Sequence, residues 1–288
     1  MLVQVQEFDV GSVASAGRAL KQQYDEQGYV IVRGLFNKEE MPALIEDIKS
    51  AKTRKGVSGL NRGELTFYSN VFFHSKALQN FIAQPKVVDL LKTLIGPDFW
   101  VRWDQAVAKG PGAGDFGWHQ DNGYSRLYDA HYQFWVALTD MTVENGGLWL
   151  QPGSHRKLLP HRWIGNHCVY EGTPPDPVFI GAEAGDVVVF SSFMLHTTKP
   201  NTTHGTRWAY VVEYMSMDHF DPTIDPPYFV VARDGKPAPE FVQSYRGTEK
   251  LTNRLKYVGF RRGLDWPAMK FIPKRLAKSF FESGQNKA

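Results

Sequence analysis

Residues 99–109 read FWVRWDQAVAK, and at this stretch the chain changes character. Polar and apolar side chains alternate along much of it, which is typical of a β-strand whose two faces meet different surroundings. Comparable short runs follow, separated by segments rich in glycine and proline: HYQFWVALTDM (131–141), GLWLQ (147–151), DVVVF (186–190) and RWAYVVEYM (207–215). Many short strands with such turns between them predict an all-β core of the sandwich or barrel kind.

The residues before this stretch are predicted to be mainly helical. The expected elements are a helix over 12–26 closed by Gly28, a strand at 29–32, a helix opened by a capping box of Asn37 and Glu40 and running to about Ala51, a loop-like segment at 52–70, and a helix over 76–95 stopped by Gly96 and Pro97. A helical layer therefore precedes the β core.

No internal repeat, low-complexity tract or linker divides the chain, so we expect a single domain over residues 1–288. Its predicted parts are the helical layer at about 10–95, the β core at about 98–220 and a C-terminal extension at 221–288. A short basic helix is expected in that extension, over residues 264–283.

Composition limits the kind of protein this is. Hydrophobic residues make up 42% and charged residues 22% of the 288, as in ordinary soluble globular proteins, and the formal charge is only +3, which argues against a nucleic-acid partner. Cys168 is the only cysteine, so neither an internal disulfide nor a multi-cysteine zinc site is expected. There is no signal-peptide pattern and no apolar run near 20 residues. We expect a cytoplasmic protein without a membrane partner, and the sequence gives no prediction of its oligomeric state.

The segment GWHQDNGY at 117–124 contains a candidate metal site, because His119 and Asp121 stand one residue apart. On an extended strand two such side chains point to the same face, so an imidazole nitrogen and a carboxylate oxygen would converge. The best candidate for a third ligand is His196, which follows the DVVVF run. Two histidines and one carboxylate on one side of a metal leave its other side open, as in non-haem Fe(II) oxygenases. Zinc fits this arrangement less well than Fe(II), because catalytic zinc prefers four-coordinate sites with one open position.

The other seven histidines are interpreted as surface or hydrogen-bonded side chains, because they lie in a turn or in polar loops or have no metal-type partner at a suitable spacing. They are His74, His131, His155, His161, His167, His204 and His219.

Two further residues point to a carboxylate ligand beside the candidate metal. Arg207 follows His196 by eleven residues inside the next predicted strand, and an antiparallel hairpin would return it to the metal. Thr198 shares a strand face with His196 if the chain stays extended. A guanidinium makes a planar, two-pronged contact with a carboxylate. With the threonine hydroxyl, it would hold the far carboxylate of a dicarboxylic acid.

The ordered set of His119, Asp121, His196 and Arg207 resembles the phytanoyl-CoA dioxygenase family of Fe(II)/2-oxoglutarate-dependent oxygenases. Other stretches match that family in the same order over roughly residues 12–220: DEQGYVIVRGLFNKEE (25–40), WHQD (118–121), WVALTDMTVENGGLWLQPGSH (135–155) and GDVVVFSSFMLHTTKPN (185–201). The resemblance implies a double-stranded β-helix, which is a cupin-like jelly roll, behind an N-terminal helical layer.

The resemblance also implies roles for individual residues. His119, Asp121 and His196 would bind Fe(II), and Arg207 with Thr198 would bind the 5-carboxylate of 2-oxoglutarate. The implied reaction consumes O₂, abstracts hydrogen from a substrate C–H bond and releases succinate and CO₂, with ascorbate as a candidate activator. Related halogenases have glycine or alanine in place of the carboxylate ligand. The presence of Asp121 therefore favours a hydroxylase, or a desaturation, cyclisation or demethylation that begins in the same way.

Several residues are weaker candidates for the pocket. Trp135 is expected to pack against the cosubstrate or to be plain core, and Gln105 and Gln120 are expected to be polar pocket contacts. The pocket lip is expected at 61–74 and 122–132, and the substrate candidates there are Tyr68, Asn70, Tyr124 and Arg126. This mixture of aromatic and polar side chains favours a small-to-medium polar metabolite.

Two other functions remain open on the sequence. One is a non-catalytic jelly-roll binding protein, which would bind no iron and release no succinate. The other is a zinc- or manganese-dependent hydrolase or isomerase on a cupin-like barrel, which would need neither Arg207 nor 2-oxoglutarate.

Overall fold

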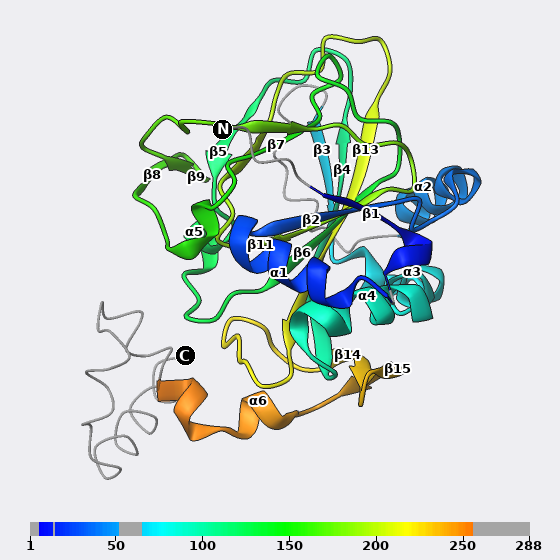
Figure 1. Cartoon of the computed structure of the whole chain (residues 1–288), viewed down its shortest axis with the longest axis vertical. Coiled ribbons are helices and arrows are strands. Elements are labelled where there is room, and N and C mark those ends of the chain that lie inside the picture. The colour runs from blue at the N-terminus through cyan, green and yellow to red at the C-terminus, as the bar shows by residue number, and fades with distance from the viewer. Residues whose placement is uncertain (1–5, 14, 52–64, 256–288) are drawn as a thin grey trace.

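The computed structural model describes residues 6–13, 15–51 and 65–255. In this part the chain forms two facing β-sheets, a helical layer and a small two-stranded sheet of β8 (His161–Ile164) and β9 (His167–Tyr170) (Figure 1). The larger sheet has, in spatial order, β1 (Glu7–Asp9), β2 (Tyr29–Arg33), β11 (Val187–Ser191), β6 (Tyr132–Ala137), β13 (Arg207–Ser216), β4 (Phe99–Lys109), β14 (Tyr228–Arg233) and β15 (Lys236–Val242), with β3 (Leu65–Ser69) also paired to β4. The smaller sheet has β10 (Val178–Ile180), β7 (Leu148–Leu150), β12 (His196–Thr198) and β5 (Phe116–His119). The predicted jelly roll behind a helical layer is confirmed.

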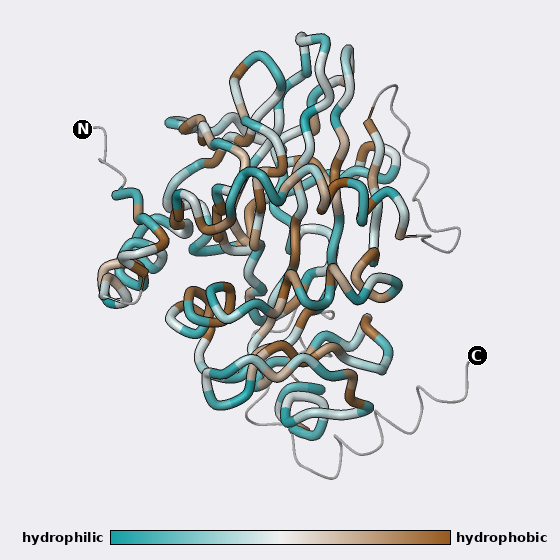
Figure 2. Tube along the Cα trace, turned by 90° about the vertical axis from the view of Figure 1, so that its right-hand side faces the viewer, coloured by the Kyte–Doolittle hydropathy of each residue, from teal (hydrophilic) through white to brown (hydrophobic). Residues whose placement is uncertain are grey.

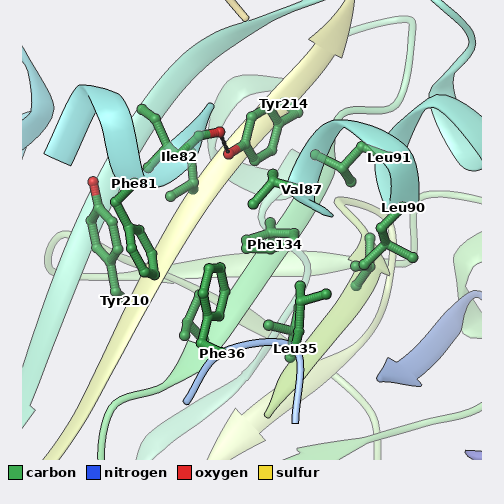
Figure 3. Packing of buried hydrophobic residues seen from close by; sticks show 14 of the residues in the cluster. Leu35, Phe36, Phe81, Ile82, Val87, Leu90, Leu91, Phe134, Tyr210 and Tyr214 are labelled. Atoms are coloured by element: carbon green, nitrogen blue, oxygen red, sulfur yellow. Dashed lines mark hydrogen bonds between the residues drawn. The ribbon is translucent and has the colours of Figure 1, made fainter. Parts of the chain in front are cut away.

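The helices cover the outer face of the larger sheet (Figure 1). They are α1 (Gly17–Gln27), α2 (Met41–Ser50), α3 (Lys76–Ile82) and α4 (Pro85–Ile95), and two further short helices, α5 (Asn122–Ser125) and α6 (Arg246–Glu249), lie outside this layer. Every second residue of a strand points to this face, so the apolar residues at those positions pack against the apolar stripes of the helices. Figure 3 shows this core: Phe36 stacks on Phe81 with ring centroids 4.3 Å apart, and the hydroxyl of Tyr214 donates to the carbonyl of Ile82 at 2.7 Å.

The alternate residues of the same strands point into the space between the two sheets, which is where polar side chains gather. In the register of β13 with β4, Arg207 lies opposite Lys109 and Glu213 lies opposite Trp103, while Gln133 of β6 lies opposite Glu213 on the other side. Figure 2 shows apolar stretches running along the central strands and hydrophilic loops at their ends. The larger sheet thus has one apolar face and one face that carries functional groups.

Three of the predicted element boundaries are wrong. Residues 65–69 of the expected loop form strand β3, whose Leu65 and Phe67 are buried. The helix expected over 76–95 is two helices, because Pro85 lacks an N–H group and holds the residue before it in extended backbone. The first helix begins at Gly17 rather than at residue 12, although Gly28 does close it in the left-handed conformation.

The capping box expected at Asn37 and Glu40 does not form. The amide of Asn37 donates to the Glu40 carboxylate at 3.0 Å, and helix α2 starts at Met41, one residue after Glu40. Strands β14 and β15, which follow residue 220, extend the larger sheet. The basic helix expected over 264–283 lies outside the described residues.

Among the residues that the structure describes, no helix combines the length and the apolar character needed to cross a membrane.

Candidate active site

The two histidines predicted to bind metal are direct neighbours in the smaller sheet. His196 of β12 lies opposite His119 of β5, and their rings are 4.1 Å apart between centroids. Asp121 reaches the same point in a different way from the one predicted. Strand β5 ends at His119, and Asp121 has helical backbone angles at the start of α5. A turn, and not strand alternation, therefore directs its carboxylate back toward the two imidazoles.

The distances within this group fit a single metal ion. Asp121 Oδ1 lies 3.6 Å from His119 Nε2, and Asp121 Oδ2 lies 3.7 Å from His196 Nε2. One ligand atom from each residue falls within 4.8 Å of the others. Two ligands that are each about 2.1 Å from a metal are separated by about 3.0 to 4.2 Å, depending on the angle between them. The three side chains can therefore hold one ion with little movement.

Backbone carbonyls fix the orientation of both rings. His119 Nδ1 lies 2.8 Å from the carbonyl of Gly117, and His196 Nδ1 lies 2.9 Å from the carbonyl of Met194. A carbonyl can only accept, so each Nδ1 carries the proton and each Nε2 offers its lone pair to the shared point.

The charge states at the site also suit a metal. Burial by itself would raise the pKa of Asp121, but the imidazoles of His196 and His119 outweigh it and lower that pKa to about 2. Burial and the neighbouring His119 ring lower the pKa of His196 to about 4. At neutral pH the site thus presents a carboxylate and a neutral His196 ring, which are the forms that bind metals.

These residues open into a cavity of about 560 Å³ between the two sheets. His119, Asp121 and His196 line it together with Arg207 and Thr198. The predicted hairpin between His196 and Arg207 is wrong, because β12 and β13 belong to different sheets. Arg207 faces the cavity from the larger sheet and Thr198 faces it from the smaller one, so the jelly roll itself brings them to one cavity.

Free donors mark the Arg207 end of the cavity as a site for an anion. Arg207 is 2% exposed, its Nη2 donates to the carbonyl of Gly146 at 3.1 Å, and its Nε has no hydrogen-bond partner in the described part of the chain. The hydroxyl oxygen of Thr198 accepts from Lys109 Nζ at 3.0 Å, so its own proton is available to donate. A carboxylate fits this place, because its oxygens can accept hydrogen bonds both from the unused N–H of the buried guanidinium and from the nearby hydroxyl.

The weaker pocket candidates divide into two groups. Trp135, Gln105 and Tyr124 line the cavity, and the amide of Gln105 is held by a hydrogen bond of 3.0 Å to Ser69.

The remaining four candidates are not among the residues that line the cavity: Gln120, Tyr68, Asn70 and Arg126. Gln120 is fully buried and hydrogen-bonds to the backbone of residues 154–159 and 193, so it fastens loops behind the metal site. Tyr68 packs on Trp208, on the other face of the larger sheet. Asn70 and Arg126 are exposed and have left-handed backbone angles.

Sequence reasoning missed several charged residues around the cavity. Lys109 is fully buried, and its Nζ donates to the hydroxyl of Thr198 and to the carbonyls of Thr198 and Lys199. Arg102, Gln133 and Glu213 line the opposite end of the cavity. These residues could have been recognised as charged or polar side chains on the same sheet face as Arg207. That shared face can be identified only when the strand register is known.

His131 was interpreted as a surface or hydrogen-bonded side chain, and that interpretation is wrong. It is fully buried, its Nε2 lies 3.4 Å from a carboxylate oxygen of Glu213, and neither ring nitrogen makes a hydrogen bond within the described residues.

Residues 24–209 match the model of one protein family, phytanoyl-CoA dioxygenase. The chain belongs to the phytanoyl-CoA dioxygenase family. A relative named ectoine dioxygenase, from Bordetella parapertussis, is 26% identical over 281 residues, which cover 82% of this chain and 86% of the relative. A probable phytanoyl-CoA dioxygenase from Caenorhabditis elegans is 26% identical over 243 residues, covering 72% of this chain and 77% of that protein.

Several solved structures share the fold of this chain. The epimerase SnoN, in complex with Fe³⁺, α-ketoglutarate and nogalamycin RO, is 21% identical with a TM-score of 0.61, over 79% of this chain and 98% of SnoN. The non-haem monooxygenase ThoJ is 22% identical with a TM-score of 0.64, over 85% of this chain and 96% of ThoJ. At this level of identity the likeness concerns the fold alone.

Proposed function

We propose that the protein is an Fe(II)/2-oxoglutarate-dependent oxygenase that hydroxylates a small-to-medium metabolite and releases succinate and CO₂. The observation that carries the proposal is one cavity that holds both a facial His119–Asp121–His196 group and a buried, partly unpaired Arg207. Iron bound there would supply the oxidation of a substrate C–H bond by O₂, coupled to decarboxylation of the keto acid.

The chain's own residues perform the binding and orienting steps. Arg207 and Thr198 hold the distal carboxylate of 2-oxoglutarate, so its keto-acid end extends toward the open side of the triad. Two anchored ends leave the cosubstrate little freedom to lose later. Trp135, buried in the cavity wall between the two sheets, excludes water from that region.

The presence of Asp121 affects which reaction, hydroxylation or halogenation, is expected. Its carboxylate fills the position that a halide would need, and this favours hydroxylation over halogenation. The fold of this chain is shared with enzymes whose names include an epimerase and a carbocyclase, and a direct product assay distinguishes hydroxylation from those outcomes.

The test is the formation of the ternary complex without oxygen. Fe(II) and 2-oxoglutarate are added anaerobically, and a weak visible metal-to-ligand charge-transfer band is expected only when both are present. Aerobic incubation should then release succinate, and a metabolite screen should find compounds that stimulate the release. A folded protein without the band would contradict the proposal, and so would turnover with Zn²⁺ or Mn²⁺ that does not depend on 2-oxoglutarate, as the hydrolase or isomerase alternative requires.

Lys109 gives a pH-dependent prediction for cosubstrate binding. Burial and the neighbouring Arg207 lower the pKa of Lys109 to about 7. A dianion at Arg207 favours the charged ammonium, so above pH 7 binding must take up a proton. The KM for 2-oxoglutarate is expected to rise between pH 7 and 9 by up to about tenfold per pH unit. In Lys109→Met the KM at pH 7 should be higher and its pH dependence should disappear.

The matched control is Lys92→Met, which alters an exposed lysine that pairs with Asp89. If Lys109→Met kept the pH profile of the parent protein, Lys109 would have no electrostatic role in cosubstrate binding.

A further inference from the structure

The end of the cavity opposite Arg207 is built from buried charges that the proposed mechanism does not use. We call Arg102, His131, Gln133, Glu213 and Asp221 the Glu213 cluster. Its members come from β4, β6, β13 and the adjoining loops, and Arg102, Gln133 and Glu213 line the cavity itself. The side chains of Arg102, Glu213 and Asp221 are 11%, 6% and 0% exposed.

The contacts within the cluster are specific. Arg102 donates through Nη1 to Glu213 and through Nε to Asp221, so one guanidinium bridges two carboxylates. Gln133 Nε2 donates to Glu213 Oε1 at 3.2 Å. Asp221 Oδ1 also accepts from the N–H and hydroxyl of Thr223, at 2.8 and 2.6 Å. Both carboxylates are therefore hydrogen-bonded within the cluster, and Glu213 also lines the cavity.

The cluster carries a net negative charge. One guanidinium stands against two carboxylates, and the fully buried His131 does not offset the second, because burial lowers its pKa. An uncompensated buried charge is unfavourable because it has lost its hydration without gaining a partner of opposite charge. A ligand that brings a positive charge to this end of the cavity would remove that cost.

The surroundings of Glu213 also suit a cation. The Trp103 side chain lines the cavity from the position opposite Glu213 in the register of β4 and β13, and an indole face attracts cations. The amide of Gln133 is oriented by its N–H donation to Glu213, which leaves its oxygen as a further acceptor. A carboxylate, an amide oxygen and an aromatic face are the groups that bind ammonium, amidinium and guanidinium ions.

The position of the cluster relative to the metal site suits a substrate. Phe190 of β11 lies opposite Gln133 in the larger sheet, and its ring is 5.0 Å from that of the metal-site residue His196. Arg207 and Glu213 lie on the same face of β13, six residues and therefore about 20 Å apart. The metal site thus has the cosubstrate end of the cavity on one side and the Glu213 cluster on the other.

We infer that the substrate carries a cationic nitrogen group, which Glu213 binds so that the rest of the molecule extends toward the metal. This inference rests on the proposed function for the identity of the site as an oxygenase pocket, and it names the class of substrate. Glu213 and Gln133 are specificity residues in this assignment, and Arg102 positions Glu213.

The experiment uses the anaerobic protein with Fe(II) and 2-oxoglutarate and two sets of matched probes. Benzamidine, benzamide and benzoate share one shape and differ in charge, and guanidinium and urea form a smaller pair. Dissociation constants are measured by calorimetry at millimolar probe concentrations. At least one cation is expected to bind tenfold or more tightly than its neutral analogue, and benzoate is expected to bind most weakly.

The matched variants are Glu213→Gln and Glu240→Gln. The first removes the charge in the cavity and keeps the shape, and it should reduce the preference for the cation at least tenfold. The second changes an exposed glutamate of β15 that pairs with Arg233, and it should have no effect.

The outcomes separate the two proposals. Absence of the charge-transfer band in folded wild-type protein overturns the oxygenase function. If the band forms but neither cation binds more tightly than its neutral analogue, the cationic substrate class is wrong. The same holds if Glu213→Gln retains both the band and the full preference. Should Glu213→Gln fail to fold, the comparison of cation and neutral analogue on the wild-type protein decides by itself.

Discussion

Replacing Asp121 with alanine is expected to reduce succinate release to below about 0.1% of the wild-type rate, a loss of at least about 4 kcal/mol of transition-state stabilisation. In the proposed iron site the carboxylate contributes one of three ligands, and it is the only negative charge among them. Without it the two imidazoles hold Fe(II) weakly, and a water molecule or an anion can take the vacated position. Iron content by elemental analysis and succinate release by chromatography measure the two effects separately.

A structural role for Asp121 predicts something different. Its side chain is 23% exposed, and its partners in the described chain are the two metal-site histidines, so its removal should leave the melting temperature of the metal-free protein nearly unchanged. Asp176→Ala, at an exposed loop position, is the control and should retain full activity. If Asp121→Ala bound iron and turned over 2-oxoglutarate normally, the assignment of the triad would be wrong.

Replacing Arg207 with methionine should raise the KM for 2-oxoglutarate by between about 30-fold and several thousand-fold, because losing a desolvated charge partner costs about 2–5 kcal/mol. Methionine keeps most of the volume of the buried side chain, so the effect reports the lost guanidinium. The KM of Arg207→Lys should fall between those of the wild type and Arg207→Met, since an ammonium retains the charge but loses the planar two-pronged contact.

The kinetic split identifies the role of Arg207. At saturating 2-oxoglutarate, kcat should recover most of its value, because in the proposed complex the guanidinium binds the end of the cosubstrate that does not react. Titration of the charge-transfer band with 2-oxoglutarate gives the same affinity change without turnover. Arg233→Met is the control, because Arg233 is exposed and its salt bridge is with Glu240. An unchanged KM in Arg207→Met would place the cosubstrate carboxylate elsewhere.

Sequence patterns were enough to predict the fold class, which is confirmed, and to select three candidate metal ligands. Alternating and β-branched runs after Phe99 indicate strands because the period of side-chain direction in a strand is two. His119, Asp121 and His196 could be selected because few side chains bind metals and their spacing is compatible with neighbouring strands. The helix boundary at Pro85 was missed because the apolar helical pattern on both sides of it outweighed the proline signal. Strand 65–69 was missed because it forms by pairing with β4, which the local sequence does not show.

The set of charged residues that share the cavity could not be read from the sequence and depends on how the strands pair. Lys109, Glu213 and Arg102 look like ordinary strand residues in the sequence, since nothing local distinguishes a charge that faces solvent from one that faces a partner sheet. The register of β13 with β4 and the packing of the second sheet bury them together, and burial raises the free-energy cost of leaving them unpaired. The candidate metal site could be predicted because the residue types themselves, two histidines and an aspartate, bind metals. The expected preference for a cationic substrate depends instead on which side chains the fold brings together.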